Sequence, residues 1–232
     1  MNDQGQKSRT RKKKTYVIID EFGDVTSHSK KEPSFGYGVS VTDDLDSYNR
    51  LSVERRKKER ERTHRKVDEV KARDDSLWNK ALMAVRIRTL GVETRSYYVD
   101  KKRPPIGWDD GSAENRRCDS TDKRNKTRNK VLKDTIKRTT DDIDGDVVVI
   151  VDYHNAHRGV RYYCKSLSKK GHNVEGGQYN SSDLSRENRK YANALQTNDY
   201  VTNAAGSATK GRPLRALCMR MKMHRYRKHE RI

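Results

Sequence analysis

Residues 147–152 read VVVIVD and contain the longest aliphatic run of the chain. A continuous run of β-branched side chains is typical of a central strand that is buried on both faces and paired in parallel. Residues 16–20, YVIID, form a second run with apolar side chains on both faces. These two runs predict neighbouring central strands of a sheet, and each run ends in an aspartate.

The segments around these strands predict further strands and helices. Residues 34–42, SFGYGVSVT, alternate large apolar residues with small or polar ones, which predicts a half-buried antiparallel neighbour of the first strand. Another strand is expected at 94–100, and residues 172–182 are a return strand or a loop. Helices are expected at 76–90, in a long basic segment ending at about 140, within 158–171 and at 186–209.

Two of these helices carry an apolar stripe that should pack on the sheet. The first, 76–90, is expected to cover one face of the sheet with a stripe at helical spacing made of Leu77, Trp78, Ala81, Leu82 and Val85. The apolar face of the last helix runs through Tyr191, Ala194, Leu195, Val201, Ala205 and Ala208. Strands punctuated by helices predict the α/β class, with a mixed sheet flanked by helices.

The composition predicts one domain with charged decorations. Among 232 residues, 31% are apolar and 37% are charged, so the core must be concentrated in a few segments. We expect a disordered basic arm at 1–14 and a domain at 15–210. Within that domain, 43–75 is expected to be a charged helical insertion, and 211–232 is a basic tail without a firm assignment.

The charge balance points to a polyanionic partner. The chain has 53 Lys and Arg against 33 Asp and Glu, a net charge of +20, which favours nucleic acid as the partner. The alternative is that much of this charge lies in solvated runs that bind nothing in particular. Lys12, Lys13 and Lys14 are candidate phosphate contacts, and the tyrosine pairs 97–98 and 162–163 are candidate stacking surfaces, although one tyrosine of such a pair usually packs inside.

Neither a membrane nor an oxidising compartment is indicated. The longest aliphatic run is too short to span a bilayer, and the basic N-terminus lacks the apolar stretch of a signal peptide. We therefore expect a soluble, cytoplasmic protein. Cys118, Cys164 and Cys218 are widely spaced and form no metal-binding motif, so they are expected to be reduced.

Carboxylates gather where the two central strands end. Asp20, Glu21 and Asp24 follow the first strand, and Asp152 follows the second. Parallel neighbours lie ~4.8 Å apart, so Asp20 and Asp152 should emerge at the same edge of the sheet. Two such carboxylates repel each other unless a proton or a cation such as Mg²⁺ or Mn²⁺ lies between them. The alternative is that each aspartate caps a turn.

Three residues beyond these strands are further candidates. Asp199 lies on the last helix, about 40° around the helix axis from Leu195, and could face the same sheet edge. His154 follows Asp152 and could move a proton, while Arg158 could hold a phosphate. Loop residues of these types are more often exposed without such a role.

Three motifs in order, IDEFGD, VVVIVD and ALQTNDYVTNAAG, resemble those of the ribonuclease-H-like proteins catalogued as domain of unknown function 3800. The resemblance covers roughly residues 16–208 and aligns seven residues with the family motifs: Asp20, Glu21, Gly23, Asp24, Asp152, Gln196 and Asp199. Phe22 departs from the serine of the first motif, and Thr197 with Asn198 replaces an apolar residue and alanine in the last. The resemblance implies a ribonuclease-H-like fold and a metal-dependent nuclease site.

Residues and resemblance together predict a divalent-metal-dependent nuclease that hydrolyses phosphodiester bonds. Asp20, Asp152 and Asp199 would bind one or two ions of Mg²⁺ or Mn²⁺, with Glu21 or Asp24 assisting and His154 as a further catalytic candidate. The alternatives are a non-catalytic nucleic-acid-binding or assembly protein on the same scaffold, or a phosphatase or transferase with the same chemistry. The oligomeric state is not indicated.

Overall fold

The computed structural model describes residues 14–25, 32–106, 120–157 and 159–230. Several sequence-based predictions fall on other residues. Lys12, Lys13, Arg158, Cys118 and residues 1–13 of the basic arm lie outside the described residues, so the structure does not bear on them.

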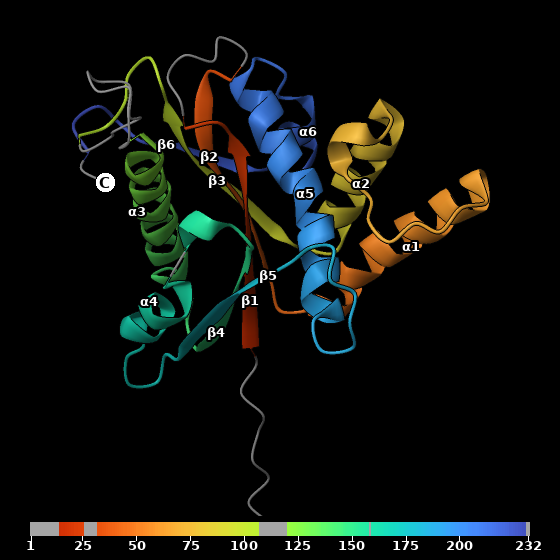
Figure 1. The fold of residues 1–232 in the computed structure, drawn as a ribbon, viewed down its shortest axis with the longest axis horizontal. Helices are drawn as coiled ribbons and strands as arrows, with labels where there is room; N and C mark the ends of the chain where they lie inside the picture. The colour runs from red at the N-terminus through yellow and green to blue at the C-terminus, as the bar shows by residue number, and fades with distance from the viewer. Residues whose placement is uncertain (1–13, 26–31, 107–119, 158, 231–232) are drawn as a thin grey trace, which may run out of the picture.

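A mixed sheet of six strands forms the centre of the protein (Figure 1). Its order is β5-β4-β1-β2-β3-β6. The strands are β1 (Lys14–Gly23), β2 (Ser34–Thr42), β3 (Glu93–Asp100), β4 (Asp146–Asp152), β5 (Val174–Tyr179) and β6 (Lys222–Arg225). The prediction of a mixed α/β sheet is therefore confirmed, and residues 174–179 form a strand and not a loop.

The two apolar runs are the neighbours that their composition predicts. β1 and β4 pair in parallel, with Ile19 opposite Val151, so Asp20 and Asp152 come next along the two strands. β2 pairs antiparallel with β1, as its period-two pattern indicated. β5 extends the parallel half of the sheet beyond β4 and forms its edge.

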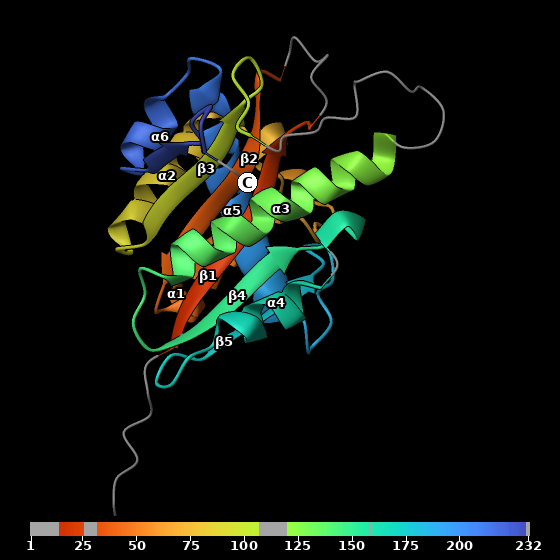
Figure 2. The same ribbon diagram turned by 90° about the vertical axis from the view of Figure 1, so that its left-hand side faces the viewer.

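Helices cover both faces of this sheet (Figures 1 and 2). On one face α5 (Arg189–Thr209) packs against β1 and β2, with α1 (Leu45–Thr63) beside it. On the opposite face lie α3 (Ser120–Thr140) and α4 (Val160–Leu167). α2 (Leu77–Thr89) and α6 (Leu214–Cys218) pack against each other and against α5. None of the helices in the described ranges is long and apolar enough to cross a membrane.

The prediction that β2 is half-buried is wrong, because nearly all of its residues are buried. The small residues in its alternating pattern do not face water: Gly36 lies against Tyr98 of β3, and Gly38 makes room for α5. A Cβ atom at Gly38 would lie 2.7 Å from the Cα of Thr202 on α5. The alternation in β2 is therefore one of side-chain size and lets a helix approach the sheet backbone closely.

The predicted packing face of 76–90 is also wrong. The helix forms, but Leu77 and Trp78 are 77% and 76% exposed, and Leu82 and Val85 are exposed as well. Ala81 is half-buried. The helix instead buries Met83, Ala84 and Ile87, which pack beneath α1 and α6 rather than on the sheet. Both faces are apolar, so periodicity could not distinguish them.

This reversed packing gives a direct stability prediction. Trp78→Gln should change the free energy of unfolding by no more than ~0.5 kcal/mol, the usual range for exposed sites. Ile87→Val should cost about 1 kcal/mol, because it removes a methylene from a fully buried side chain. Urea denaturation of both variants checks this. A larger loss for Trp78→Gln than for Ile87→Val would contradict the observed packing.

Two charged segments are more ordered than their composition suggests. The N-terminal half of α1 buries Leu45, Tyr48 and Leu51 against the core, while Figure 1 shows its C-terminal half projecting from the body of the domain. The unassigned tail contains α6 and β6, and β6 pairs in parallel with β3. The sheet therefore extends into a segment that sequence patterns left unassigned.

Candidate active site

Three carboxylates from three separate elements meet at one end of the parallel strands. Asp20 comes from β1, Asp152 from β4 and Asp199 from the middle of α5. They line a small pocket of about 70 Å³, here called the carboxylate pocket, together with Glu69, Val70, Lys71, Ser181, Leu195 and Gln196. The structure thus brings together three of the carboxylates that the sequence singled out.

The fold explains why these residues converge. The parallel register of β1 and β4 places Asp20 and Asp152 side by side. α5 crosses the same face of the sheet, and Leu195 in its apolar stripe sits under the pocket while Asp199, one turn later, lines it. Asp199 lies at the flank of this apolar stripe, and the path of α5 across the sheet turns it toward the ends of β1 and β4.

Burial and mutual repulsion disfavour the charged form of all three carboxylates. Burial raises the pKa of Asp20 well above its usual range, and the charges of Asp152 and Asp199 raise it further. Burial also raises the pKa of Asp152 and that of Asp199. The Ala72 N–H, which donates to Asp199 at 2.5 Å, and the charge of Lys71 only partly oppose the shift at Asp199.

One oxygen of each carboxylate is held by the main chain. Asp20 Oδ1 accepts from the Glu21 N–H at 2.8 Å, and Asp152 Oδ1 accepts from the Tyr153 N–H at 3.0 Å. Asp199 Oδ2 accepts from Ala72. Within the described part of the chain, the second oxygen of each carboxylate accepts no hydrogen bond. The pocket therefore offers three carboxylate oxygens that no protein donor uses.

The sequence-based prediction missed a fourth carboxylate, that of Glu69. It lies in the segment between α1 and α2, where Ser181 Oγ donates to its Oε1 at 3.2 Å and Lys71 Nζ lies 3.6 Å from its Oε2. Its charge contributes to the raised pKa of Asp152. Glu69 stands within a run of mixed charge, so no local pattern marks it out from its neighbours.

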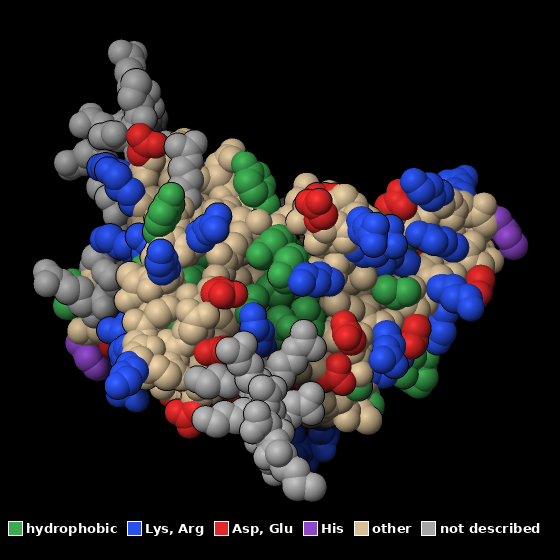
Figure 3. Space-filling view, turned by 90° about the horizontal axis from the view of Figure 1, so that it is seen from below, with side chains coloured by type: hydrophobic (Ala, Val, Ile, Leu, Met, Phe, Trp, Pro, Cys, Tyr) green, Lys and Arg blue, Asp and Glu red, His purple; other side chains and the backbone are tan. Residues whose placement is uncertain are grey.

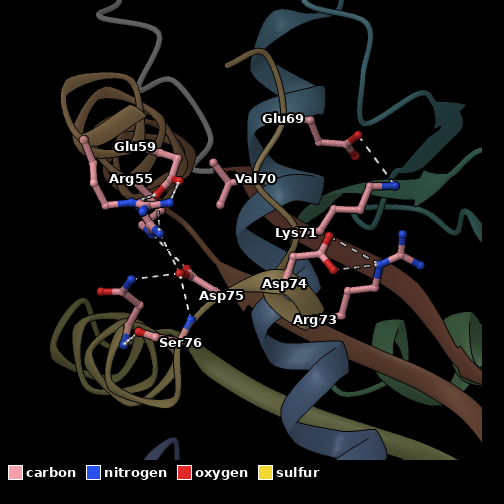
Figure 4. Close-up of a pocket in the computed structure, with 11 residues that line it drawn as sticks. Arg55, Glu59, Glu69, Val70, Lys71, Arg73, Asp74, Asp75 and Ser76 are labelled. Atoms are coloured by element: carbon pink, nitrogen blue, oxygen red, sulfur yellow. Dashed lines mark hydrogen bonds and ion pairs between the residues drawn. The ribbon is translucent and has the colours of Figure 1, made fainter. Parts of the chain in front are cut away.

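Asp75 anchors the segment that carries Glu69 (Figure 4). Arg55 on α1 donates two hydrogen bonds to Asp75, at 2.5 and 2.8 Å, and the Tyr200 hydroxyl donates a third at 2.6 Å. Burial alone would raise the pKa of Asp75, but these hydrogen bonds lower it to about 2. In Figure 4, Glu69 and Lys71 turn away from Arg55, toward the other side of the segment.

Removing this anchor should loosen the carboxylate pocket. Arg55→Ala should lower the free energy of unfolding by about 1–2 kcal/mol at pH 7. This is less than the full cost of breaking a buried ion pair, because solvent screens part of the interaction. Because the folded-state pKa of Asp75 lies below its unfolded value, the stabilisation is present above pH ~4 and fades as the pH falls toward 2. Denaturation at pH 7 and at pH 3 checks this, and an equal loss at both would contradict it.

Gln196 ties the walls of the pocket together. Its Nε2 donates to the carbonyl oxygens of Ser181 at 2.7 Å and Asp68 at 3.2 Å, and its Oε1 accepts from Arg56. These bonds join α5 to the segment before Glu69 and to the segment after β5. Gln196, which belongs to the last motif, is therefore a positioning residue for the pocket.

Glu21 and Asp24 lie with basic partners and not in the carboxylate pocket. Glu21 Oε2 is 3.6 Å from His157 Nε2 and 3.7 Å from Arg128 Nε, and Asp24 Oδ1 is 4.0 Å from Arg128. Burial would raise the pKa of Glu21, but His157 and Arg128 lower it. The Tyr37 hydroxyl, 3.1 Å from His157 Nε2, completes this cluster.

The remaining predicted residues, His154 and Lys14, do not line the carboxylate pocket. His154 Nδ1 accepts a hydrogen bond from the Ala156 N–H at 3.0 Å, and burial lowers the pKa of His154, so its ring is neutral at pH 7. Lys14 begins β1, at the other end of the strand from Asp20, and its Nζ lies 3.8 Å from Glu175. Lys14 therefore lies away from the three aspartates and lines a separate groove at the edge of the sheet.

The donor set suits a hard divalent cation, since Mg²⁺ and Mn²⁺ take carboxylate oxygens. As the side chains stand, no three His, Cys, Asp or Glu residues in the described ranges are arranged so that they could hold a metal ion. A cation would therefore have to draw the carboxylates together by side-chain rotation. The second oxygen of each aspartate accepts no hydrogen bond from the described residues, so it is available to bind a cation after such a rotation.

Comparison of the chain with models of protein families, with curated proteins and with solved structures finds no match. The resemblance to the ribonuclease-H-like family of unknown function 3800 therefore stays a hypothesis.

Proposed function

We propose that this protein is a ribonuclease-H-like, divalent-metal-dependent nuclease whose active site is the carboxylate pocket. One observation carries the proposal. Three half-buried aspartates from separate elements converge, and each keeps one oxygen without a donor among the described residues, in a chain of net charge +20. An uncompensated carboxylate cluster would repel nucleic acid, whereas a cation-loaded cluster in basic surroundings would attract it.

The sheet supports the fold part of this proposal. Its mixed order, with two parallel strands beside β1 and an antiparallel pair on the other side, is consistent with a ribonuclease-H-like layout. The candidate residues also lie at the carboxyl ends of parallel strands, where α/β sheets usually bind their ligands.

Asp20, Asp152 and Asp199 would hold the metal, with Glu69 at the border of the pocket. A bound divalent ion supplies Lewis-acid stabilisation of the charge that develops on the phosphate. The chain's own part is to orient the three carboxylates through the main-chain N–H groups that bind one oxygen of each. His154 does not line the pocket, and the lone pair on its Nδ1 is engaged by the Ala156 N–H, so the proton of the attacking water is left to solvent and not to His154.

A non-catalytic nucleic-acid-binding or assembly protein is the second candidate. It is favoured by the finding that the described side chains do not form a ready-made metal site. In that case the aspartates cap the strand ends through their bonds to Glu21 and Tyr153 and have no further role.

Cleavage of labelled single-stranded, duplex and hybrid DNA and RNA tests the proposal. The wild type should cut at least one of these substrates with Mg²⁺ or Mn²⁺ and none with EDTA. Asp152→Asn should abolish cutting without unfolding the protein, while Asp144→Asn, an exposed aspartate before β4, should not. Binding without cleavage under every metal condition would favour the second candidate.

A further inference from the structure

The edge strand β5 borders a long open groove at some distance from the carboxylate pocket. This edge groove has a volume of about 1060 Å³. Its aromatic residues are Tyr16, Tyr162, Tyr179 and Tyr191, and its basic residues are Lys14, Arg161, Lys165 and Lys190. Figure 3 shows hydrophobic side chains gathered near the centre of the lower face, with Lys, Arg, Asp and Glu side chains around them. The mechanism proposed above uses none of these residues.

Two tyrosines stack on each other in the edge groove and form an aromatic surface whose inner ring faces are already in contact. The ring of Tyr179 folds back over Gly177, where an added Cβ would lie only 2.9 Å from the Tyr179 hydroxyl. It meets Tyr191, from the first turn of α5, at 4.0 Å between ring centroids and an angle of 32°. Both residues are half-buried, so the stacked pair is partly open to a ligand. Glycine at 177 is what allows this arrangement.

The charges around the aromatic surface are mostly positive. Among the described residues, Lys14, Arg161, Lys165 and Lys190 line the edge groove with a single acidic residue, Glu175. Lys14 pairs loosely with Glu175, at 3.8 Å, and Lys190 Nζ lies 4.6 Å from the centre of the Tyr191 ring. Four basic residues against one acidic residue favour a polyanionic ligand.

The part of the edge groove that contains Tyr179 and Tyr191 leads toward the carboxylate pocket on the α5 face of the sheet, while α4 lines the groove from the opposite face. Tyr179 is the register partner of Asp152 on the neighbouring strand. Tyr191 and Asp199 lie on α5, eight residues and therefore about 12 Å apart along the helix axis. A chain of nucleotides lying in the groove would thus point its next phosphates at the three aspartates.

We propose that the edge groove binds single-stranded nucleic acid, with bases stacked on Tyr179 and Tyr191 and phosphates held by the surrounding Lys and Arg. Stacking requires unpaired bases, whose faces a duplex does not offer, so single strands should bind more tightly than duplexes. This inference rests on the proposed function, since it names the form of nucleic acid that reaches the same site.

The exposed edge of β5 could also pair with a peptide strand, which is the main alternative occupant. β5 is only six residues long and contains Gly176 and Gly177, so it offers little side-chain specificity to such a peptide. The aromatic and basic composition instead matches stacking platforms for single strands. Binding of a peptide strand to β5 is one of the outcomes that the following test distinguishes.

Fluorescence anisotropy in EDTA tests the inference without relying on catalysis. The probes are a labelled single strand of about 12 nucleotides, within the ~4–16 typical of stacking platforms, and the matching duplex. Tyr191→Leu should weaken single-strand binding by about 5- to 100-fold, while Tyr191→Phe, which keeps the ring face, should bind like the wild type. Tyr162→Ala, at an 81% exposed side chain that is safe for folding, should weaken it less.

Matched controls separate stacking from general effects of charge. Trp78→Ala removes an equally exposed aromatic side chain from α2 and should not change binding. Lys165→Glu, in the edge groove, should weaken binding more than Lys57→Glu on the exposed part of α1. Wild-type binding by Tyr191→Leu, equal affinity for single strand and duplex, or displacement of the strand by an uncharged extended peptide would overturn the inference.

The two proposals can fail separately. If the edge-groove variants lose single-strand binding and no substrate is ever cut, the inference stands and the nuclease proposal fails. If metal-dependent cutting is observed but Tyr191→Leu binds and cuts single strands as the wild type does, the nuclease proposal stands and the inference fails.

Discussion

Asp20→Asn is expected to have opposite effects on activity and on stability. Metal-dependent cleavage should fall by at least ~100-fold, because a catalytic metal supplies several kcal/mol and each 1.36 kcal/mol is tenfold in rate. Without divalent ions, the free energy of unfolding at pH 7 should rise by about 1–3 kcal/mol, because the variant no longer buries an uncompensated charge. Asn keeps the oxygen that accepts the Glu21 N–H.

The pH dependence follows from the raised pKa of Asp20. The unfolded chain releases this proton at an ordinary pKa of ~3.9, whereas the folded chain keeps it to a higher pH. The free energy of unfolding of the wild type therefore decreases as the pH rises through the interval between the two values. The advantage of Asp20→Asn should therefore increase as the pH rises from 4 to 7 and should disappear toward pH 4.

Thermal and urea denaturation of both proteins, at pH 4 and pH 7 and with EDTA or Mg²⁺, check these expectations. Mg²⁺ should stabilise the wild type by ~2.7 kcal/mol at a hundred times its dissociation constant and should leave Asp20→Asn unchanged. Asp144→Asn is the control and should behave like the wild type throughout. If Asp20→Asn is less stable than the wild type at pH 7 in EDTA, the cluster does not repel as described.

A side chain that lowers stability but is required for activity is expected at a functional site. Because Asn keeps the oxygen that accepts the Glu21 N–H, a turn-capping role alone predicts little change in stability for Asp20→Asn. A clear gain in stability thus distinguishes the repelling carboxylate cluster from the turn-capping alternative, even before any substrate is known.

Local patterns were sufficient for the centre of the fold and for three site residues. The β-branched run before Asp152 and the apolar run before Asp20 specify two buried neighbouring strands, and parallel pairing brings their ends together. Asp199 could be placed because a helix has a fixed period and its apolar stripe is clear.

Other features depend on contacts that local patterns do not encode. Glu69 reaches the carboxylate pocket only because Asp75 and Gln196 fix the segment around it. The buried face of α2 is set by α1 and α6, which lie elsewhere in the sequence. Tyr179 and Tyr191 meet because Gly177 leaves room for a folded-back ring. These features follow from tertiary packing, which overrides local periodicity.

Gly38→Val is expected to cause the largest loss of stability among the variants considered. A Cβ at this position would lie 2.7 Å from the Thr202 Cα and 3.0 Å from its nitrogen, so the backbone of α5 must move away from β2. The cost should be about 3 kcal/mol or more, at the upper end for overpacking. Because Asp199 lies one turn before Thr202, metal-induced stabilisation should weaken as well. Urea denaturation with and without Mg²⁺ measures both effects.

Gly206→Ala is the matched control on the other side of the same interface. Gly206 lies within α5, and an added Cβ would make an ordinary contact with Phe22 of β1, at 3.4 Å. Since glycine is unfavourable inside a helix, this variant should be neutral or gain up to ~1 kcal/mol, and its response to Mg²⁺ should match the wild type. If both glycine variants lose stability and Mg²⁺ response equally, the close approach at Gly38 does not set the position of Asp199, and another contact of α5 must do so.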